Sequence, residues 1–139
     1  MMRKEFNEVV QKVPNLTADG VTSPLAADFF SKRQDFVNNA LYLQQANDAV
    51  EFLRGIGKST RFSQWQKNNC LPERIGALIE WNSGRPVSPG AVIVAALHEG
   101  FTMGGASTGS VYFNFLPRQI ETELMNLRRR QLIKQVIGA

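Results

Sequence analysis

Catalytic side chains are scarce in this sequence. It contains one histidine, His98, and one cysteine, Cys70, so the chain alone supplies neither a histidine metal cluster nor an internal disulfide. Glu99 follows His98, and neighbours on a helix lie about 100° apart, so the two side chains are expected on different faces. No local feature supports a Cys70–His98 nucleophile pair. We expect a protein that is not an enzyme, with no catalytic residues, no metal and no cofactor.

A glycine-rich run at residues 104–110 could in principle cradle a phosphate. It lacks the lysine that follows the last glycine of a P-loop, and no helix opens directly after it. Short apolar runs at 101–103 and 111–115 flank it, which is typical of two strands and a tip. The sequence therefore predicts a small β-hairpin here.

Basic residues offer the other recognisable chemistry. The chain has 16 Lys and Arg against 12 Asp and Glu, a net charge of +4. Most of the excess lies in the last helix, predicted from Pro117 to about Ile137, and a local positive charge steers a protein toward polyanions such as DNA or RNA. The candidate phosphate-binding residues are Arg118, Arg128, Arg129, Arg130, Lys134, Arg85, Arg74, Lys58 and Arg61.

The run Arg128-Arg129-Arg130 cannot form one row, because three consecutive helical residues fan over more than half the circumference. At least one of these cations is expected to pack its stem beside Leu127 or Leu132. A solvated helix end is the alternative interpretation.

The strongest structural pattern lies between Ser88 and Gly100. Ser88 suits the N-cap, Pro89 the first helical position, and Gly100 the turn beyond the end. Seven of the nine residues from Gly90 to His98 are Ala, Val, Ile or Leu, so this helix should be enclosed on all sides.

Residues 71–115 predict a helix that ends before Gly84, the apolar helix, and the hairpin, which is the order of elements in a winged helix-turn-helix protein. The composition argues against that function, because the second helix lacks the polar side chains that read base edges.

A second helical face contains Phe36, Leu43, Asn47, Val50 and Leu53, which together with Ala40 form a series spaced three or four residues apart. A polar residue in such a seam can specify an oligomer, so these five residues are the candidate interface of a homodimer or of a complex with a host protein. The alternative is that Asn47 bonds inside the monomer.

Other patterns complete the predicted architecture. Apolar spacing predicts a helix over residues 2–13, followed by a loop over 15–22. Ser23-Pro24 predicts the start of a second helical region that runs on or breaks near Ser31. Residues 58–69 are polar, with Phe62 and Trp65 as anchors. We predict a mainly α, single-domain helical bundle over 1–139, with five to six helices and one small β-hairpin. No apolar run is long enough for a membrane span, and we expect a cytoplasmic protein.

The run Gly84-Arg85-Pro86-Val87-Ser88-Pro89-Gly90-Ala91, the later Ile93, and Tyr112-Phe113-Asn114 resemble a pattern in small proteins of phages, plasmids and integrative elements. The segment 36–52 is also similar, while Pro89 and Trp81 depart from the pattern. The resemblance implies a mobile-element origin and a shared helical fold, with no assigned activity.

Two hypotheses of function follow. The first is a nucleic-acid-associated accessory or regulatory protein of a mobile genetic element that binds mainly through phosphate contacts. The second is a non-enzymatic protein-interaction or self-associating helical module.

Overall fold

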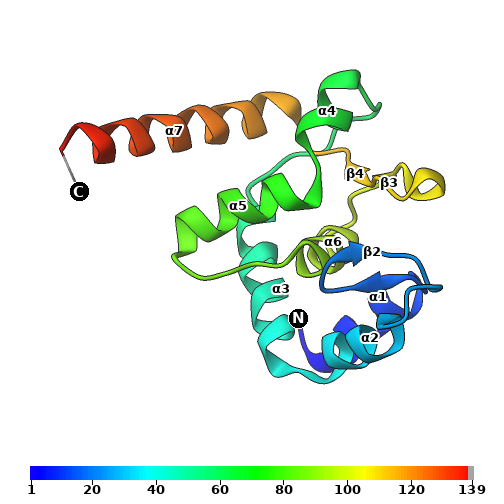
Figure 1. Ribbon diagram of the computed structural model, residues 1–139. Coiled ribbons are helices and arrows are strands. Elements are labelled where there is room, and N and C mark those ends of the chain that lie inside the picture. The colour runs from blue at the N-terminus through cyan, green and yellow to red at the C-terminus, as the bar shows by residue number, and fades with distance from the viewer. Residues whose placement is uncertain (138–139) are drawn as a thin grey trace.

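Helix α6 (Pro89–His98) lies at the centre of the computed structural model, which describes residues 1–137 (Figure 1). The Ser88 hydroxyl oxygen accepts a hydrogen bond from the Ala91 amide at 3.3 Å, and Pro89 occupies the first turn. Every residue from 90 to 96 is buried. Helices α1, α3 and α5 and strand β2 pack around it, so the prediction of an enclosed core helix is confirmed.

Within residues 1–137 the chain forms seven α-helices and two small antiparallel strand pairs, as expected for a mainly helical domain. The predicted domain range also includes residues 138–139, which lie outside the described part. The helices are α1 (Arg3–Gln11), α2 (Phe29–Asn38), α3 (Ala40–Leu53), α4 (Gln64–Asn69), α5 (Pro72–Ser83), α6 (Pro89–His98) and α7 (Pro117–Val136). The strands are β1 (Leu16–Thr17), β2 (Gly20–Val21), β3 (Met103–Gly104) and β4 (Tyr112–Phe113), and a short 3-10 helix spans Ala106–Thr108.

The segment 15–22, predicted to be a loop, contains the antiparallel pair β1–β2, so that prediction is wrong in detail. Gly20 adopts φ 105°, a left-handed conformation that suits glycine in the tight turn. The Gly90 amide donates to the Ala18 carbonyl at 2.9 Å, which docks this turn against the start of α6. Two-residue strands carry too little alternation to be recognised in a sequence.

The second helical region begins at Phe29, not at Ser23. Ser23-Pro24 opens only a turn, in which the Ala26 amide donates to the Ser23 carbonyl at 3.2 Å. The helical region breaks at Asn39, not near Ser31. Asn39 has an extended backbone (ψ 119°), and its side-chain oxygen accepts a hydrogen bond from the Leu41 amide, which caps α3. Asn39 satisfies an orphan amide of α3, and this capping ends one helix and begins the next.

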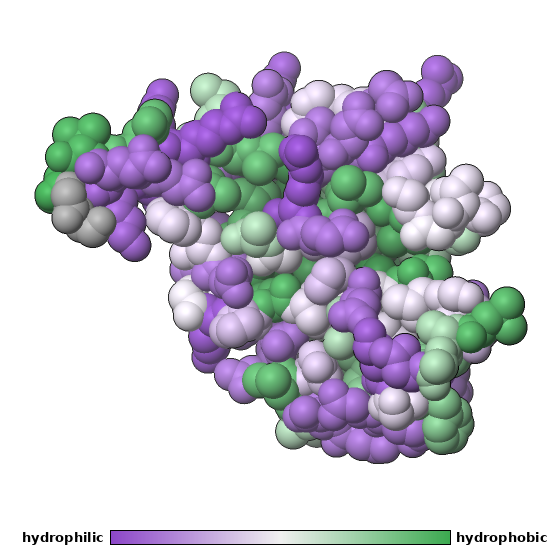
Figure 2. Space-filling model, in the orientation of Figure 1, coloured by the Kyte–Doolittle hydropathy of each residue, from purple (hydrophilic) through white to green (hydrophobic). Residues whose placement is uncertain are grey.

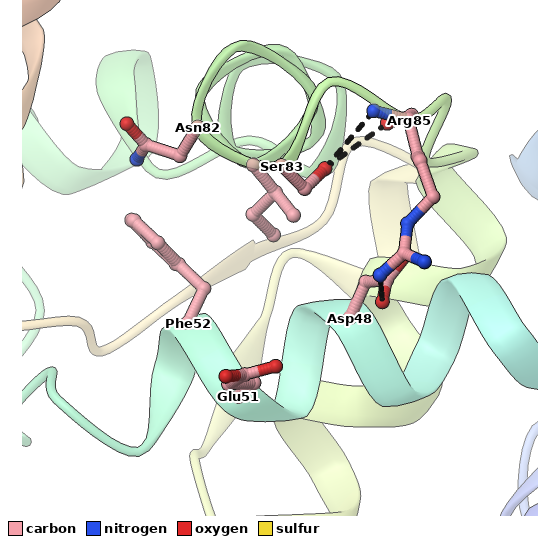
Figure 3. Close-up of a pocket in the computed structure, with 7 residues that line it drawn as sticks. Asp48, Glu51, Phe52, Asn82, Ser83 and Arg85 are labelled. Atoms are coloured by element: carbon pink, nitrogen blue, oxygen red, sulfur yellow. Dashed lines mark hydrogen bonds and ion pairs between the residues drawn. The ribbon is translucent and has the colours of Figure 1, made fainter.

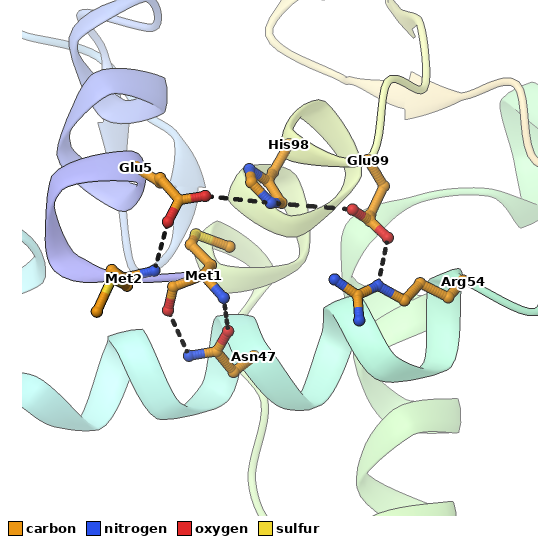
Figure 4. Close-up of polar contacts among 7 residues, drawn as sticks. All are labelled: Met1, Met2, Glu5, Asn47, Arg54, His98 and Glu99. Carbon is orange, nitrogen blue, oxygen red and sulfur yellow. Dashed lines mark hydrogen bonds and ion pairs between the residues drawn. The ribbon is translucent and has the colours of Figure 1, made fainter.

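The predicted interface face belongs to the core. Phe36, Val50 and Leu53 are at most 3% exposed and Leu43 is half-buried. Asn47 exchanges two hydrogen bonds with Met1, from the Met1 amino group at 2.8 Å and to its carbonyl at 3.0 Å (Figure 4). Phe36, Val50 and Leu53 are therefore not available to a partner, because α6 packs against α3 and the Phe6 ring of α1 lies 5.2 Å from the Phe36 ring.

Helix α4 was not predicted from the polar segment 58–69. It begins with a reciprocal capping box between Ser63 and Gln66. The buried Gln66 amide also donates to the Phe115 carbonyl at 3.0 Å, and Asn114 joins the Thr102 amide to the Ser59 carbonyl. Two buried amide side chains thus tie the segment that contains α4 to the β3–β4 hairpin, which pairs Met103 with Phe113.

The order α5, α6, hairpin is present as the sequence predicted. In a winged helix-turn-helix protein the second helix is free to enter a DNA groove. Here α6 is enclosed, so it does not read bases.

Candidate nucleic-acid interface

Helix α7 is anchored at its beginning and free at its end. Ile120 is fully buried and Leu124 and Leu127 are half-buried against the core. The Leu116 amide donates to the Gly57 carbonyl at 2.8 Å at the root of the helix. From residue 128 to residue 137 every residue is exposed, and the helix projects beyond the rest of the molecule (Figure 1). We call residues 128–137 the α7 arm.

The α7 arm carries four of the predicted cations. Arg128, Arg129 and Lys134 make no ion pair among residues 1–137, and Arg130 donates to the Asn82 side-chain oxygen at 3.0 Å. The stretch from 124 to 137 contains no acidic residue. The arm therefore presents an uncompensated positive charge to solvent, and its three arginines point in different directions, as consecutive helical residues must.

Other predicted cations are engaged within the chain. Arg85 donates to Asp48 at 2.6 Å across a cavity of about 310 Å³ beside Phe52 (Figure 3). Arg74 donates to Asn69 at 3.0 Å. The Lys58 ammonium lies 4.9 Å from the centre of the Phe101 ring. These cations make internal contacts that a phosphate would have to replace.

Arg61 and Arg118 are exposed, and Arg118 lines a small cavity at the root of α7 with Gly55 and Ile56. Arg118 lies in the first turn of the same helix as the arm cations. Four of the nine predicted residues therefore lie on the arm and one lies at its root, while the other four belong to α5, its following loop and the loop before α4.

Figure 2 shows that the far end of α7 is not only basic: hydrophobic side chains gather there, beside hydrophilic ones along the helix. The aliphatic residues are more than half exposed, with exposed fractions of 60% for Leu132, 57% for Ile133, 86% for Val136 and 73% for Ile137. Their spacing places them on one side of the helix. We call these four residues the apolar stripe.

The opposite side of the arm faces α5 across a groove. Two adjoining cavities of about 400 and 370 Å³ share Trp81 and Gln131. Lys134 and Gln135 line one of them, and Leu127 and Glu80 the other. We call this the Trp81 groove. Sequence reasoning missed it, although the spacing of Gln131, Lys134 and Gln135 by three and four residues marks one helix face.

No family model, curated protein or solved structure matches this chain. The candidate site is therefore defined by the geometry alone. No helix within residues 1–137 combines the length and the apolarity needed to cross a membrane.

His98 lies between two carboxylates, those of Glu5 and Glu99. Glu99 is the C-cap of α6, and its carboxylate lies 3.9 Å from His98 Nε2, while Glu5 lies 3.8 Å away on the other side (Figure 4). Arg54 donates to Glu99 at 3.0 Å. Two long side chains can therefore approach each other even though neighbouring residues lie about 100° apart on a helix.

Cys70 follows α4 and is fully buried. Burial raises the pKa of its thiol to about 12, because the thiolate would lose its hydration. A nucleophilic cysteine needs the opposite shift. The buried thiol packs with the core residues, consistent with a structural role.

Proposed function

We propose that this chain is a nucleic-acid-associated accessory or regulatory protein that binds mainly phosphate groups through the α7 arm. The mobile-element origin is part of this proposal and depends on the resemblance in residues 36–52 and 84–114. The supporting observation is the uncompensated charge of the arm: Arg128, Arg129 and Lys134 are exposed, without an ion pair among the described residues and without an acid between 124 and 137.

The shape of the arm suits phosphate contacts. Because the end of the arm projects beyond the body (Figure 1), a nucleic acid can approach it without displacing α5 or the core. The fan of Arg128 and Arg129 can meet phosphates on more than one side of the helix. Such contacts carry no sequence information by themselves, so this binding should be largely independent of base sequence.

The experiment is fluorescence anisotropy with labelled DNA across a salt series. Replacing Arg128, Arg129 and Lys134 together by Gln should weaken binding and flatten the log–log salt dependence. The change in slope should be up to about 3 for a duplex, since each phosphate contact contributes about 0.9. A matched variant replaces Lys4, Lys12 and Lys67 by Gln, which removes the same charge from exposed positions on α1, its C-cap and α4.

The two variants separate a local interface from general charge. Loss of affinity and slope in the arm variant alone supports the proposal. Equal losses in both variants indicate non-specific attraction by net charge, and unchanged binding in the arm variant contradicts the proposal.

The apolar stripe favours a second candidate function, a protein-interaction or self-associating module. Contiguous exposed aliphatic side chains are unfavourable in water and often mark a protein contact. The interface would then be the stripe on α7 and not the buried face of α3. Two copies would bring their arm cations together, so self-association should strengthen as salt screens the repulsion.

Sedimentation velocity over a concentration and salt series tests the self-associating form. A dimer that tightens with salt and is lost when Leu132 and Val136 are changed to Gln supports it. A monomer at every concentration and salt contradicts it. The opposite salt dependences distinguish the two functions.

A further inference from the structure

The Trp81 groove combines three kinds of side chain at one place. Trp81 supplies a half-buried indole on α5. Gln131 and Gln135 supply amide donors and acceptors from α7, and Lys134 supplies an ammonium. Gln131, Lys134 and Gln135 share one helix face because they are three and four residues apart. The two adjoining cavities, about 400 and 370 Å³, have the size typical of small-molecule sites, roughly 300–1,000 Å³.

An aromatic face, amide groups and a cation together match the parts of a nucleotide. A base can stack on an indole, an amide can bond to its edge, and an ammonium can hold the adjacent phosphate. In a duplex the base faces are already stacked and only the edges are open. An indole placed between two helices is therefore accessible only to an unpaired base.

The charges around the groove orient the ligand. Glu80 lines the cavity that also contains Leu127, and its carboxylate repels a phosphate there. Lys134 lines the other cavity, and Arg128 precedes Gln131 by three residues on the same flank of α7. The phosphate backbone would follow Arg128 and Lys134 along the arm, and a base edge with an amino group could donate to Glu80.

We propose that the Trp81 groove binds single-stranded nucleic acid, with one unpaired base stacked on Trp81 and the neighbouring phosphate on Lys134. This inference depends on the nucleic-acid binding proposed above and names its ligand as a single strand.

Trp81 reports on the groove directly, because the chain has only one other tryptophan, Trp65. In a Trp65→Phe background, oligothymidylate should quench the fluorescence of Trp81 as it binds. A labelled blunt-ended duplex, tested in parallel by anisotropy, should bind more weakly and leave this fluorescence nearly unchanged.

Two substitutions test the stack. Trp81→Leu keeps an apolar side chain and removes the aromatic face, so affinity for oligothymidylate should fall roughly 5- to 150-fold, the effect of losing one stacked base. Trp81→Phe keeps a smaller aromatic face and should recover part of that loss. Circular dichroism checks that each variant is folded; the fluorescence titration needs no change at position 81.

The outcomes separate the two proposals. Two results would overturn the groove proposal and leave the arm proposal intact. One is unchanged Trp81 fluorescence while anisotropy shows that oligothymidylate is bound. The other is wild-type affinity in a folded Trp81→Leu variant. No binding of either DNA form, even at low salt, overturns both. Quenching that persists when Arg128 and Arg129 are changed to Gln supports the groove proposal and shows that the groove binds without these two arginines.

Discussion

Helices α6 and α7 use aliphatic residues in opposite ways. In α6 they are enclosed by four elements, and residues 90–96 are all buried. In the α7 arm, Leu132, Ile133, Val136 and Ile137 are more than half exposed on a helix that leaves the body. The core helix stabilises the fold through the burial of its apolar side chains, whereas the side chains of the arm remain exposed to solvent. Substitutions in α6 should therefore affect folding, and substitutions in the arm should affect binding.

The largest effect on stability should come from Ile93 in α6. Ile93 is fully buried, and Ile93→Ala leaves a cavity that lowers the free energy of unfolding by about 2–5 kcal/mol. The matched change Ile133→Ala, at a side chain 57% exposed, should stay within about 0.5 kcal/mol. Urea denaturation measures both, and similar losses in the two variants would contradict the contrast between the helices.

Thiol reactivity gives a second contrast. Because the pKa of Cys70 is raised to about 12, its thiolate population at pH 8 should be roughly a thousandfold below that of an ordinary exposed cysteine. Ile133→Cys, made in a Cys70→Ala background, should react quickly with a thiol reagent such as DTNB, while native Cys70 should react only after unfolding. Fast modification of native Cys70 would show that the core opens near α4.

Gly90 tests the contact between α6 and the β1–β2 turn. A Cβ added at Gly90 would overlap the Thr17 carbonyl oxygen, so backbone must shift. Gly90→Ala should cost about 1–3 kcal/mol of unfolding free energy, the usual range for overpacking. Gly55→Ala is the control, since its nearest atom lies 3.7 Å from the added carbon. A thermal melt in which both variants match the wild type would place the turn away from α6.

The smallest effect concerns Glu5, which lies beside His98 at the end of α6. The hydrogen bond from the Met2 amide, assisted by the charges of the N-terminus and His98, lowers the pKa of Glu5. Its contribution to stability is therefore present above the unfolded-state pKa of about 4.3 and is lost as the pH falls through the lower folded-state value. In Glu5→Gln, the urea midpoint of unfolding should fall less steeply as the pH drops below about 5. Glu8→Gln, on the same helix, serves as the control.

The sequence by itself determined the elements whose signals are local. Ser88 and Pro89 mark the start of α6, its uniform apolarity indicates burial, and the glycine-rich tip between two short apolar runs indicates the β3–β4 hairpin. It also located the cations of the α7 arm. That the three consecutive arginines point in different directions follows from helix geometry. These features depend on neighbouring residues and on a fixed helical period.

Only the tertiary structure decided which faces are covered and which cations are engaged. Nothing local distinguishes the face of Phe36 and Leu53, which is buried, from the apolar stripe of Leu132 and Val136, which is exposed. Partners distant in sequence decide this, as when Asn47 binds Met1 and Arg85 binds Asp48. The Trp81 groove likewise exists because α5 and α7, far apart in the chain, lie side by side. Long-range packing determines such pairings, and a local pattern does not encode them.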